Sequence, residues 1–263
     1  MKSKICIIGG GNLGKALAEG LLNSKLYAGK DITITRRKIN HLNYLKDKGL
    51  KITSANAKAV QDAGIVLLCV KPFQCKEIVK EISKKIKAGQ IIISLVSGVS
   101  IKELQDLLPP KVIIFRAMPN TAMAINQSMT CISSADSNEN ALKMVNKLFN
   151  SLGKTIVIDE KLMDAATILG ACGTAFAMRY IRANIQAGIE IGFDAATASL
   201  IAAQTVKGAA DLLITNGTHP EQEIDKVTTP MGVTITGLNQ MEHDGLSSSI
   251  IKGINASYKK MKG

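Results

Sequence analysis

Lys4-Ile5-Cys6-Ile7-Ile8, followed at once by Gly9-Gly10-Gly11-Asn12-Leu13-Gly14, is the stretch of sequence that decides the fold. The first five residues have the length and apolar character of a buried strand. Gly9, Gly11 and Gly14 then fit the spacing G-x-G-x-x-G. The first glycine allows a tight turn, the second lets a pyrophosphate approach the backbone, and the third lets a helix pack close to the sheet. This pattern favours a dinucleotide-binding turn over a plain structural turn.

A helix is expected directly after the glycines. Leu13, Leu17 and Leu21 recur at the spacing of one helical face. The N-terminus of that helix would offer free N–H groups to a phosphate. The strand before and the helix after therefore supply the context that the glycine motif requires.

Composition limits the classes of protein that the chain can belong to. Its 263 residues suggest one large or two modest domains, and 46% hydrophobic residues are enough for a sizeable core. No apolar run approaches the roughly 20 residues of a membrane span, and a strand begins too early for a signal peptide. The five cysteines are scattered and odd in number, which is typical of reduced thiols. We therefore expect a cytoplasmic protein with no membrane segment.

The net charge of +12 could attract anionic ligands or nucleic acid. Aromatic residues make up only 3% of the chain and tryptophan is missing, so base-stacking surfaces are not expected. The lysines are spread along amphipathic stretches such as residues 76–87. We interpret the charge as a solvated basic surface and expect no nucleic-acid partner.

The first part of the chain alternates expected strands and helices. The expected strands are Lys4–Ile8, Asp31–Thr35, Lys51–Thr53, Gly64–Val70, Gln90–Leu95 and Val112–Phe115. The expected helices between them are Asn12–Leu26, Ile39–Lys48, Cys75–Lys87 and Ile101–Leu108. Such alternation predicts an α/β domain with a Rossmann-type, doubly wound parallel sheet. A strand–helix–strand stretch over residues 129–158 would complete a dinucleotide-binding domain of residues 1–158.

Residues 159–263 predict a second, all-α domain. The expected helices are Met163–Leu169, Ala175–Ile191, Ala195–Ile214, Gln222–Val227, Val233–His243 and Leu246–Met261. They are rich in alanine and other small residues that permit close helix packing. A helical domain this apolar cannot easily bury all of its apolar surface within one chain. We therefore predict that it forms the interface of a homo-oligomer and is the substrate and dimerisation domain.

The end of the second expected strand indicates which dinucleotide binds. NAD-binding folds place an acidic residue there for the ribose 2′-hydroxyl. Here Thr35 is followed by Arg36-Arg37-Lys38, and Asp31 lies at the wrong end of the strand. Thr35 and Arg36 would suit a 2′-phosphate. We predict NADP(H), with NADH left open as a second donor, over the alternative of an exposed basic helix start.

Ligands in such sheets bind beyond the carboxyl ends of the strands. Val70-Lys71-Pro72 follows the fourth expected strand and Ser97 follows the fifth, so these residues are expected beside the nicotinamide. The alternative for Lys71 is an ordinary surface lysine.

Proline and glycine in the segment Val227–Gly237 enforce a turn before a helix. Turn N–H groups and a helix N-terminus together form a carboxylate-binding nest. A capped helix start is an equally good interpretation, since threonine is also a common N-cap.

Acid–base candidates are few. His41, His219 and His243 pair with no nucleophile, Thr218–Glu221 resembles a capping box, and no metal-ligand spacing exists. This scarcity fits hydride transfer, in which the cofactor carries the chemistry and the protein orients the reactants. It fits an imine in particular, because a protonated C=N is already electrophilic.

At these residues the chain resembles the pyrroline-5-carboxylate reductase family along essentially its whole length. The matching motifs are the glycine turn with Asn12, Val70–Pro72, Arg116–Thr121 and Asp225–Ile235. The resemblance implies reduction of 1-pyrroline-5-carboxylate to L-proline by NADPH. It also implies dimers through the helical domain, which often assemble further and whose sites lie between the dinucleotide domain of one chain and the helices of its partner.

The resemblance assigns roles residue by residue. Thr234 would hydrogen-bond the ring nitrogen as the catalytic residue, and the backbone of Gly232, Val233 and Thr234 would hold the substrate carboxylate. Together with the residues argued above, the predicted cofactor-binding set is Gly9, Gly11, Asn12, Leu13, Gly14, Thr35, Arg36, Asn56, Val70, Lys71, Pro72 and Ser97. The predicted substrate-binding set is Met118, Pro119, Asn120, Thr229, Gly232, Val233 and Thr234, and no metal site is expected.

The chain departs from the family pattern in one segment next to the expected substrate pocket. The family usually has Ser-Gly-Ser-Gly-Pro-Ala where this chain has Gly170-Ala171-Cys172-Gly173-Thr174-Ala175. The Pro-Gly-Gly of the family signature is also Pro230-Met231-Gly232 here. Reduction of a related cyclic imine and a non-catalytic NADP-binding module therefore remain alternatives. A β-hydroxy acid is disfavoured because no lysine or histidine acid lies in 170–174.

Overall fold

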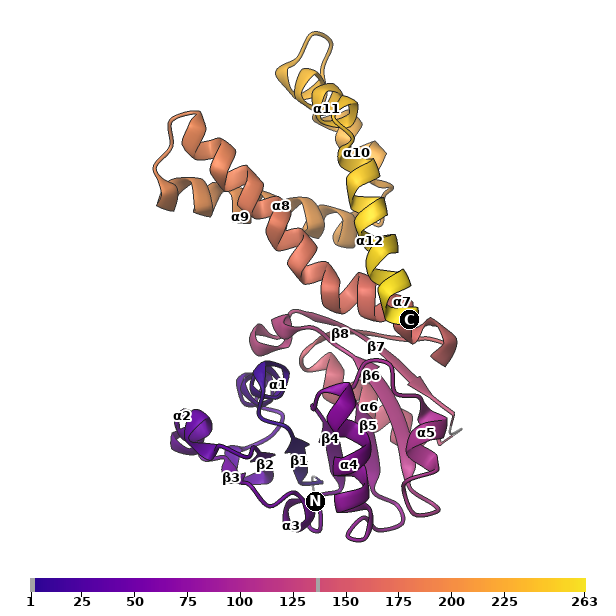
Figure 1. The fold of residues 1–263 in the computed structure, drawn as a ribbon. Helices are drawn as coiled ribbons and strands as arrows, with labels where there is room; N and C mark the ends of the chain where they lie inside the picture. The colour runs from indigo at the N-terminus through magenta and orange to yellow at the C-terminus, as the bar shows by residue number, and fades with distance from the viewer. Residues whose placement is uncertain (1–2, 136–137) are drawn as a thin grey trace. The chain divides into compact units, whose positions relative to one another are not determined.

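The structure is a computed structural model that describes residues 3–135 and 138–263. The chain divides into two compact units, Met1–Cys172 and Gly173–Gly263 (Figure 1). The domain boundary expected after residue 158 stays a prediction.

Among the described residues of the first unit, eight strands form one sheet in the order β3-β2-β1-β4-β5-β6-β7-β8. The strands are β1 (Ile5–Ile8), β2 (Ile32–Thr35), β3 (Lys51–Thr53), β4 (Ile65–Leu68), β5 (Ile91–Ser94), β6 (Ile113–Met118), β7 (Ser128–Ser134) and β8 (Gly153–Val157). Strands β1 to β6 pair in parallel, with register Ile5↔Ile32 and Ile5↔Ile65 at the centre. The doubly wound α/β prediction is confirmed for a mostly parallel sheet.

The last two strands run the other way. Strand β7 pairs antiparallel with β6, and β8 is parallel to β7. Residues 119–127 join β6 to β7 and contain the short 3-10 helix η3 (Thr121–Ile125). So short a connection cannot cross over to a parallel neighbour, which takes a dozen residues or more. The fully parallel sheet expected from the sequence is therefore wrong at this edge.

Two hydrophobic cores lie on the two faces of the sheet. Alternate strand residues point to opposite faces, so Ile5 and Ile7 belong to one core while Cys6 and Ile8 belong to the other. Helices α1 (Asn12–Asn23) and α6 (Glu139–Asn150) cover the first face. Helices α4 (Pro72–Ser83) and α5 (Ile101–Gln105) cover the second. Layers on both faces place the strand ends, and the loops after them, at one open edge.

Several helix ends differ from the expected ones for local reasons. Helix α1 ends at Asn23, and soon after it Lys25 adopts a positive φ of 56°. The expected helix at Ile39–Lys48 is a 3-10 turn, η2 (Ile39–Leu42), followed by α2 (Asn43–Asp47). Helix α4 begins at Pro72 because proline suits the first helical position. The short α3 (Asn56–Ala59) follows β3.

The first unit ends in a further short helical segment. The 3-10 helix η4 (Glu160–Leu162) leads into α7 (Met163–Ala166) and then the π-helix η5 (Thr167–Cys172). The segment that departs from the family pattern thus begins in a π-helix, a geometry often found at functional sites.

The second unit is entirely helical, as expected. It contains α8 (Gly173–Glu190), α9 (Ala195–Asn216), α10 (Pro220–Lys226), α11 (Val233–His243) and α12 (Leu246–Lys262). A Cβ at Gly188 would lie 3.1 Å from Ala198 Cβ, so α8 and α9 pack closely through small residues. No described helix is both long and apolar enough to cross a membrane.

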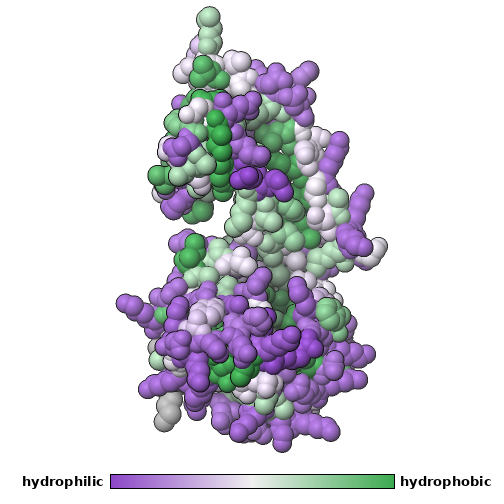
Figure 2. Space-filling model, turned by 60° about the vertical axis from the view of Figure 1, so that its left-hand side comes forward, coloured by the Kyte–Doolittle hydropathy of each residue, from purple (hydrophilic) through white to green (hydrophobic). Residues whose placement is uncertain are grey.

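The helical unit leaves most of its apolar side chains uncovered. Within residues 173–263, all of which are described, the buried hydrophobic residues are Ala198 and Ala202. Ile191, Leu200 and Ile214 are each more than 70% exposed. Figure 2 shows hydrophobic side chains at the surface of this unit. So large an apolar surface is typical of a subunit interface.

Candidate active site

The glycine turn between β1 and α1 has the geometry that its sequence predicts. Gly9 adopts a φ of +105°, and a Cβ there would lie 2.5 Å from the carbonyl oxygen of Cys69. A Cβ on Gly14 would collide with the Gly9 carbonyl oxygen. At Gly11, by contrast, nothing lies within 4 Å of the Cβ position. The first and third glycines are needed by the fold, and the second leaves space beside the backbone.

The end of β2 holds this turn in place. Gly9 N and Gly10 N both donate to the Thr35 carbonyl oxygen, at 3.2 and 2.7 Å, and Gly9 N also lies 3.3 Å from Thr35 Oγ1. Arg36 Nη1 donates to the Gly10 carbonyl oxygen at 2.9 Å. Thr35 is only 1% exposed, so its hydroxyl serves the turn in this structure. One nitrogen of the Arg36 guanidinium is therefore also bonded to the backbone of the turn, whereas Arg37 is exposed.

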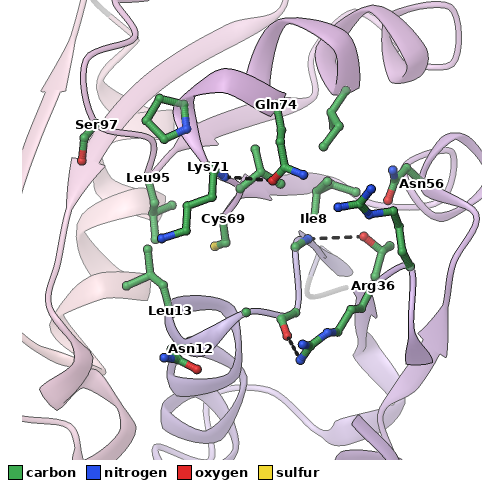
Figure 3. Close-up of a pocket in the computed structure, with 18 of the residues that line it drawn as sticks. Ile8, Asn12, Leu13, Arg36, Asn56, Cys69, Lys71, Gln74, Leu95 and Ser97 are labelled. Atoms are coloured by element: carbon green, nitrogen blue, oxygen red, sulfur yellow. Dashed lines mark hydrogen bonds between the residues drawn. The ribbon is translucent and has the colours of Figure 1, made fainter. Parts of the chain in front are cut away.

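A cleft of about 930 Å³ opens beside the turn (Figure 3). It is lined by Ile8, Gly9, Gly10, Gly11, Asn12, Leu13, Thr35, Arg36, Arg37, Lys38, Asn56, Cys69, Val70, Lys71, Pro72, Gln74, Ile78, Leu95, Ser97 and Thr121. Apart from Gly14, which packs behind the turn, every residue of the predicted cofactor-binding set is on this wall. Sequence reasoning did not single out Gln74 and Ile78, which lie on α4 outside any motif, and it placed Thr121 in a matching motif without giving it a cofactor role.

The cleft fits a phosphorylated dinucleotide. Helix α1 has the open N-terminus that a pyrophosphate needs: its N-cap is Gly11, no side chain caps it, and its first turn has no acidic residue. Three basic side chains, Arg36, Arg37 and Lys38, line the end next to β2, and no carboxylate of the described part of the chain lines the cleft. Guanidinium groups match phosphate geometry, so this end suits a 2′-phosphate.

Lys71 and Ser97 come from the loops after β4 and β5, and Gln74 from the first turn of α4. Lys71 N donates to Gln74 Oε1 at 3.4 Å, which caps α4. Figure 3 shows the Lys71 side chain reaching across the cleft toward Leu13. Ser97, three residues after β5, also lines the cleft. Asn56, at the start of α3, donates through Nδ2 to Glu81 Oε2 at 3.0 Å. These positions follow the rule that ligands lie beyond the carboxyl ends of the strands.

Met118, Pro119 and Asn120 at the end of β6 are buried. Asn120 caps η3 by accepting the Ala122 N–H at 3.0 Å, and its own Nδ2 donates to the Gly170 carbonyl oxygen at 3.2 Å. The predicted substrate residue Asn120 thereby contacts the segment that departs from the family pattern.

Thr229 and Gly232 lie in the turn that leads into α11, and Val233 and Thr234 are the first two residues of that helix. Gly232 is the N-cap of α11, and its N–H donates to the Thr229 carbonyl oxygen at 2.9 Å. Val233 is 90% exposed and Thr234 is exposed too. Among the described residues no hydrogen bond occupies the Thr234 hydroxyl, and α11 has no side-chain cap. An uncapped helix start beside a free hydroxyl can bind a carboxylate and a ring nitrogen together.

Metal-ligating side chains form no cluster in the described ranges, 3–135 and 138–263. No three His, Cys, Asp or Glu side chains gather there in a way that could hold a metal ion. Burial raises the pKa of the Cys69 thiol at the cleft wall, which keeps it neutral. His219 caps α10: its Nδ1 accepts a hydrogen bond from the Glu221 backbone N–H at 3.3 Å. The backbone N–H of His219 in turn donates to Gln222 Oε1 at 3.1 Å. The predicted capping box is present, centred on His219 rather than Thr218.

The glycine turn, the basic strand end, the cleft and the separate helical unit define a dinucleotide-dependent oxidoreductase. Two family models match the chain: "NADP oxidoreductase coenzyme F420-dependent" over residues 4–98, and "Pyrroline-5-carboxylate reductase dimerisation" over residues 160–263. The helical unit is thus a dimerisation domain, in keeping with its uncovered apolar surface.

Relatives that match nearly the whole of this chain show to which family of oxidoreductases it belongs. The chain is 45% identical to pyrroline-5-carboxylate reductase 2 of Dictyostelium discoideum, covering 97% of this chain and 91% of the relative. It is 47% identical to pyrroline-5-carboxylate reductase 1 of the same organism, but spans only 49% of that protein's length. The pyrroline carboxylate reductase of Plasmodium falciparum, solved with NADP bound, aligns with a TM-score of 0.90 at 26% identity, covering 99% of this chain and 97% of that one. This chain belongs to the pyrroline-5-carboxylate reductase family.

Proposed function

We propose that this protein reduces 1-pyrroline-5-carboxylate to L-proline with NADPH as the hydride donor. The observation that carries the proposal is the presence, in one chain of this family, of a dinucleotide cleft with a basic end and of an uncapped α11 start with a free threonine hydroxyl. The first suits the donor and the second suits a small imine that bears a carboxylate.

The residues of the cleft orient the cofactor. The backbone at Gly11 and the first turn of α1 would hold the pyrophosphate, and Arg36, Arg37 and Lys38 would hold the 2′-phosphate. The lack of a carboxylate at the end of β2 favours NADPH over NADH, because nothing there would accept the two ribose hydroxyls of NADH. When bound, NADPH supplies the hydride that adds to C5 of the imine.

The start of α11 would orient the substrate. The free backbone N–H groups of Val233 and Thr234 would bind the carboxylate, since an uncapped helix N-terminus favours negative charge. Gly232, whose own N–H is held by the Thr229 carbonyl oxygen, would shape the turn beside it. The Thr234 hydroxyl would hydrogen-bond the ring nitrogen and hold the protonated imine in orientation. A strong side-chain acid is not needed for this step, because the nitrogen already carries the proton that proline retains.

The active form is a homodimer or a larger homo-oligomer formed through the helical unit. Exposed apolar residues on α8 and α9, such as Met178 and Leu200, would be covered in the interface. A cytoplasmic location, absence of nucleic-acid binding and use of NADH as a slower donor complete the proposal.

A related cyclic imine is the second candidate substrate. The hydrogen bond from Asn120 to Gly170 favours it, because it ties a predicted substrate residue to the segment that lacks the usual serines and proline. A substrate panel tests both candidates: oxidation of NADPH and of NADH is followed with pyrroline-5-carboxylate, with its six-membered-ring homologue and with an imine that lacks the carboxylate. The proposal expects the highest kcat/KM with pyrroline-5-carboxylate. NADPH binding without turnover of any imine would point to a non-catalytic module.

A further inference from the structure

Arg116 on β6 is a buried charge for which the cofactor and substrate assignments provide no role. Its side chain is only 5% exposed, and within residues 3–135 and 138–263 its one ion pair joins Nη1 to Glu160 Oε1 at 3.2 Å. Nε and Nη2 are buried and have no hydrogen-bond partner among the described residues. A buried arginine is costly unless it is paired, and among the described residues Glu160 is its ion-pair partner, with the Glu103 carboxylate also interacting with it electrostatically.

Glu160 holds a second group with the same oxygen. Its Oε1 also accepts the backbone N–H of Ile101, the first residue of α5, at 2.7 Å. N–H groups in the first turn of a helix have no partner within the helix. A single carboxylate therefore joins the buried β6 arginine to the start of α5. Glu160 lies 44 residues after Arg116 and 59 residues after Ile101 in the sequence.

Between β5 and α5 lies the turn Leu95–Ser100, which carries Ser97 to the cleft wall. Its first residue is fixed by the bond from Leu95 N to the Leu68 carbonyl oxygen, at 3.0 Å. Its last residue, Ser100, caps α5 in a reciprocal box with Glu103. The Glu160–Ile101 bond lies directly after that cap. The turn is thus fixed to the sheet at one end and to the Arg116–Glu160 pair at the other.

We propose that Glu160 and Arg116 are positioning residues that hold the turn Leu95–Ser100 in place, so that Ser97 presents the right surface to the nicotinamide end of the cofactor. The inference rests on the proposed function of the cleft. Neither residue lines the cleft, so the effect is transmitted through the start of α5. Hydride transfer depends on this placement, whereas most of the binding energy for NADPH comes from the glycine turn and the basic end of the cleft.

The test compares Glu160→Ala with Asp106→Ala. Asp106 is also on the α5 side and forms an exposed ion pair with Lys102, so its loss changes the charge equally without touching the Arg116–Glu160 pair. In Glu160→Ala, kcat with NADPH and pyrroline-5-carboxylate should fall about 10- to 100-fold, because misplacement of reacting groups by about 1 Å has effects of this size. The Kd for NADPH, measured by nucleotide fluorescence, should stay within about threefold of the control.

Hydrogen exchange gives a readout that does not depend on activity. In the native protein the Ile101 amide should be protected, and in Glu160→Ala it should exchange as fast as a free first-turn amide. Glu160→Gln keeps an oxygen acceptor, so it should restore both the protection and most of kcat, and it serves if the alanine variant does not fold. Unchanged kcat, equal losses of kcat and NADPH affinity, or an unprotected Ile101 amide in the native protein would overturn the proposal. A native protein that reduces no imine would contradict the proposed function, while the exchange and fluorescence results would still test the pair.

Discussion

Replacing Gly14 with alanine is expected to destabilise the unliganded protein, whereas the same change at Gly11 should leave it folded and weaken NADPH binding. A Cβ on Gly14 would lie 3.1 Å from the Gly9 carbonyl carbon, 3.4 Å from Ile7 Cγ2 and closer still to the Gly9 oxygen. The atoms in the way belong to the backbone of the glycine turn and to a buried side chain of β1, neither of which can move aside easily, so α1 itself must shift.

The size of the Gly14→Ala effect follows from two opposing contributions. Overpacking costs about 1–3 kcal/mol, and contact with backbone favours the upper half of that range. Alanine regains about 1 kcal/mol over glycine through helix propensity. The net loss is about 1–2 kcal/mol, or roughly 2–8 °C in Tm for a protein of this size.

Gly11→Ala should behave differently because the Cβ meets nothing within 4 Å. Its φ of −78° and ψ of −166° are open to alanine. The gain of about 0.4–1 kcal/mol from a less flexible unfolded chain is offset because alanine is a poorer N-cap than glycine, so the unliganded protein should stay within about 1 kcal/mol of native stability. The methyl group would occupy the space that the pyrophosphate needs, and the Kd for NADPH should rise at least about 10-fold. Thermal unfolding without ligand and a fluorescence titration measure both effects. A Gly14→Ala protein as stable as the native one, or a Gly11→Ala protein with native affinity, would refute the reasoning.

Three further predictions concern the other parts of the site. Thr234→Ala should lower kcat for pyrroline-5-carboxylate by about 100-fold, and Thr234→Ser should stay active. Thr236→Ala should keep native kcat, since the Thr236 hydroxyl donates to the Gly232 carbonyl oxygen. Equal effects at both positions in steady-state kinetics would contradict the role of Thr234. Arg37→Gln should raise KM for NADPH and leave KM for NADH unchanged, while Arg36→Gln should raise both because it also releases the glycine turn; parallel titrations with the two nucleotides separate them. Hydrogen bonds from the first turn of α9 lower the pKa of the Asp194 carboxyl. The ionised carboxylate therefore stabilises the folded protein fully above its unfolded pKa, and this stabilisation is lost as pH falls through the lower folded pKa. The fall in Tm below about pH 4 should be smaller in Asp194→Asn.

The central part of the fold could be predicted from local sequence. Strand β1, the glycine turn and α1 follow from an apolar run and three glycines, of which Gly9 and Gly14 lie against backbone and Gly11 leaves open space, as expected. The helices of the second unit follow from long periodic stretches, and α11 begins and ends at the expected residues. Such elements are determined by neighbours a few residues away in sequence.

Features that depend on distant residues could not be predicted in this way. Apolar periodicity does not give strand direction, so β7 was expected to be parallel, although the short connection after Met118 could have indicated the reversal. The burial of Thr35 against Gly9 and the pairing of Arg116 with Glu160 join segments 26 and 44 residues apart. Nothing near Arg116 or Glu160 in the sequence indicates their pairing.

The central claim is that the glycine-turn cleft supplies the hydride and the α11 start presents the imine. The most direct test is isotope transfer: the protein is incubated with pyrroline-5-carboxylate and NADPH that carries deuterium at the transferable position of its nicotinamide ring. The account predicts L-proline with one deuterium at C5, formed in step with NADPH oxidation and about 100-fold more slowly in Thr234→Ala. Oxidation of NADPH without deuterium in proline, or no turnover by the native protein, would contradict it.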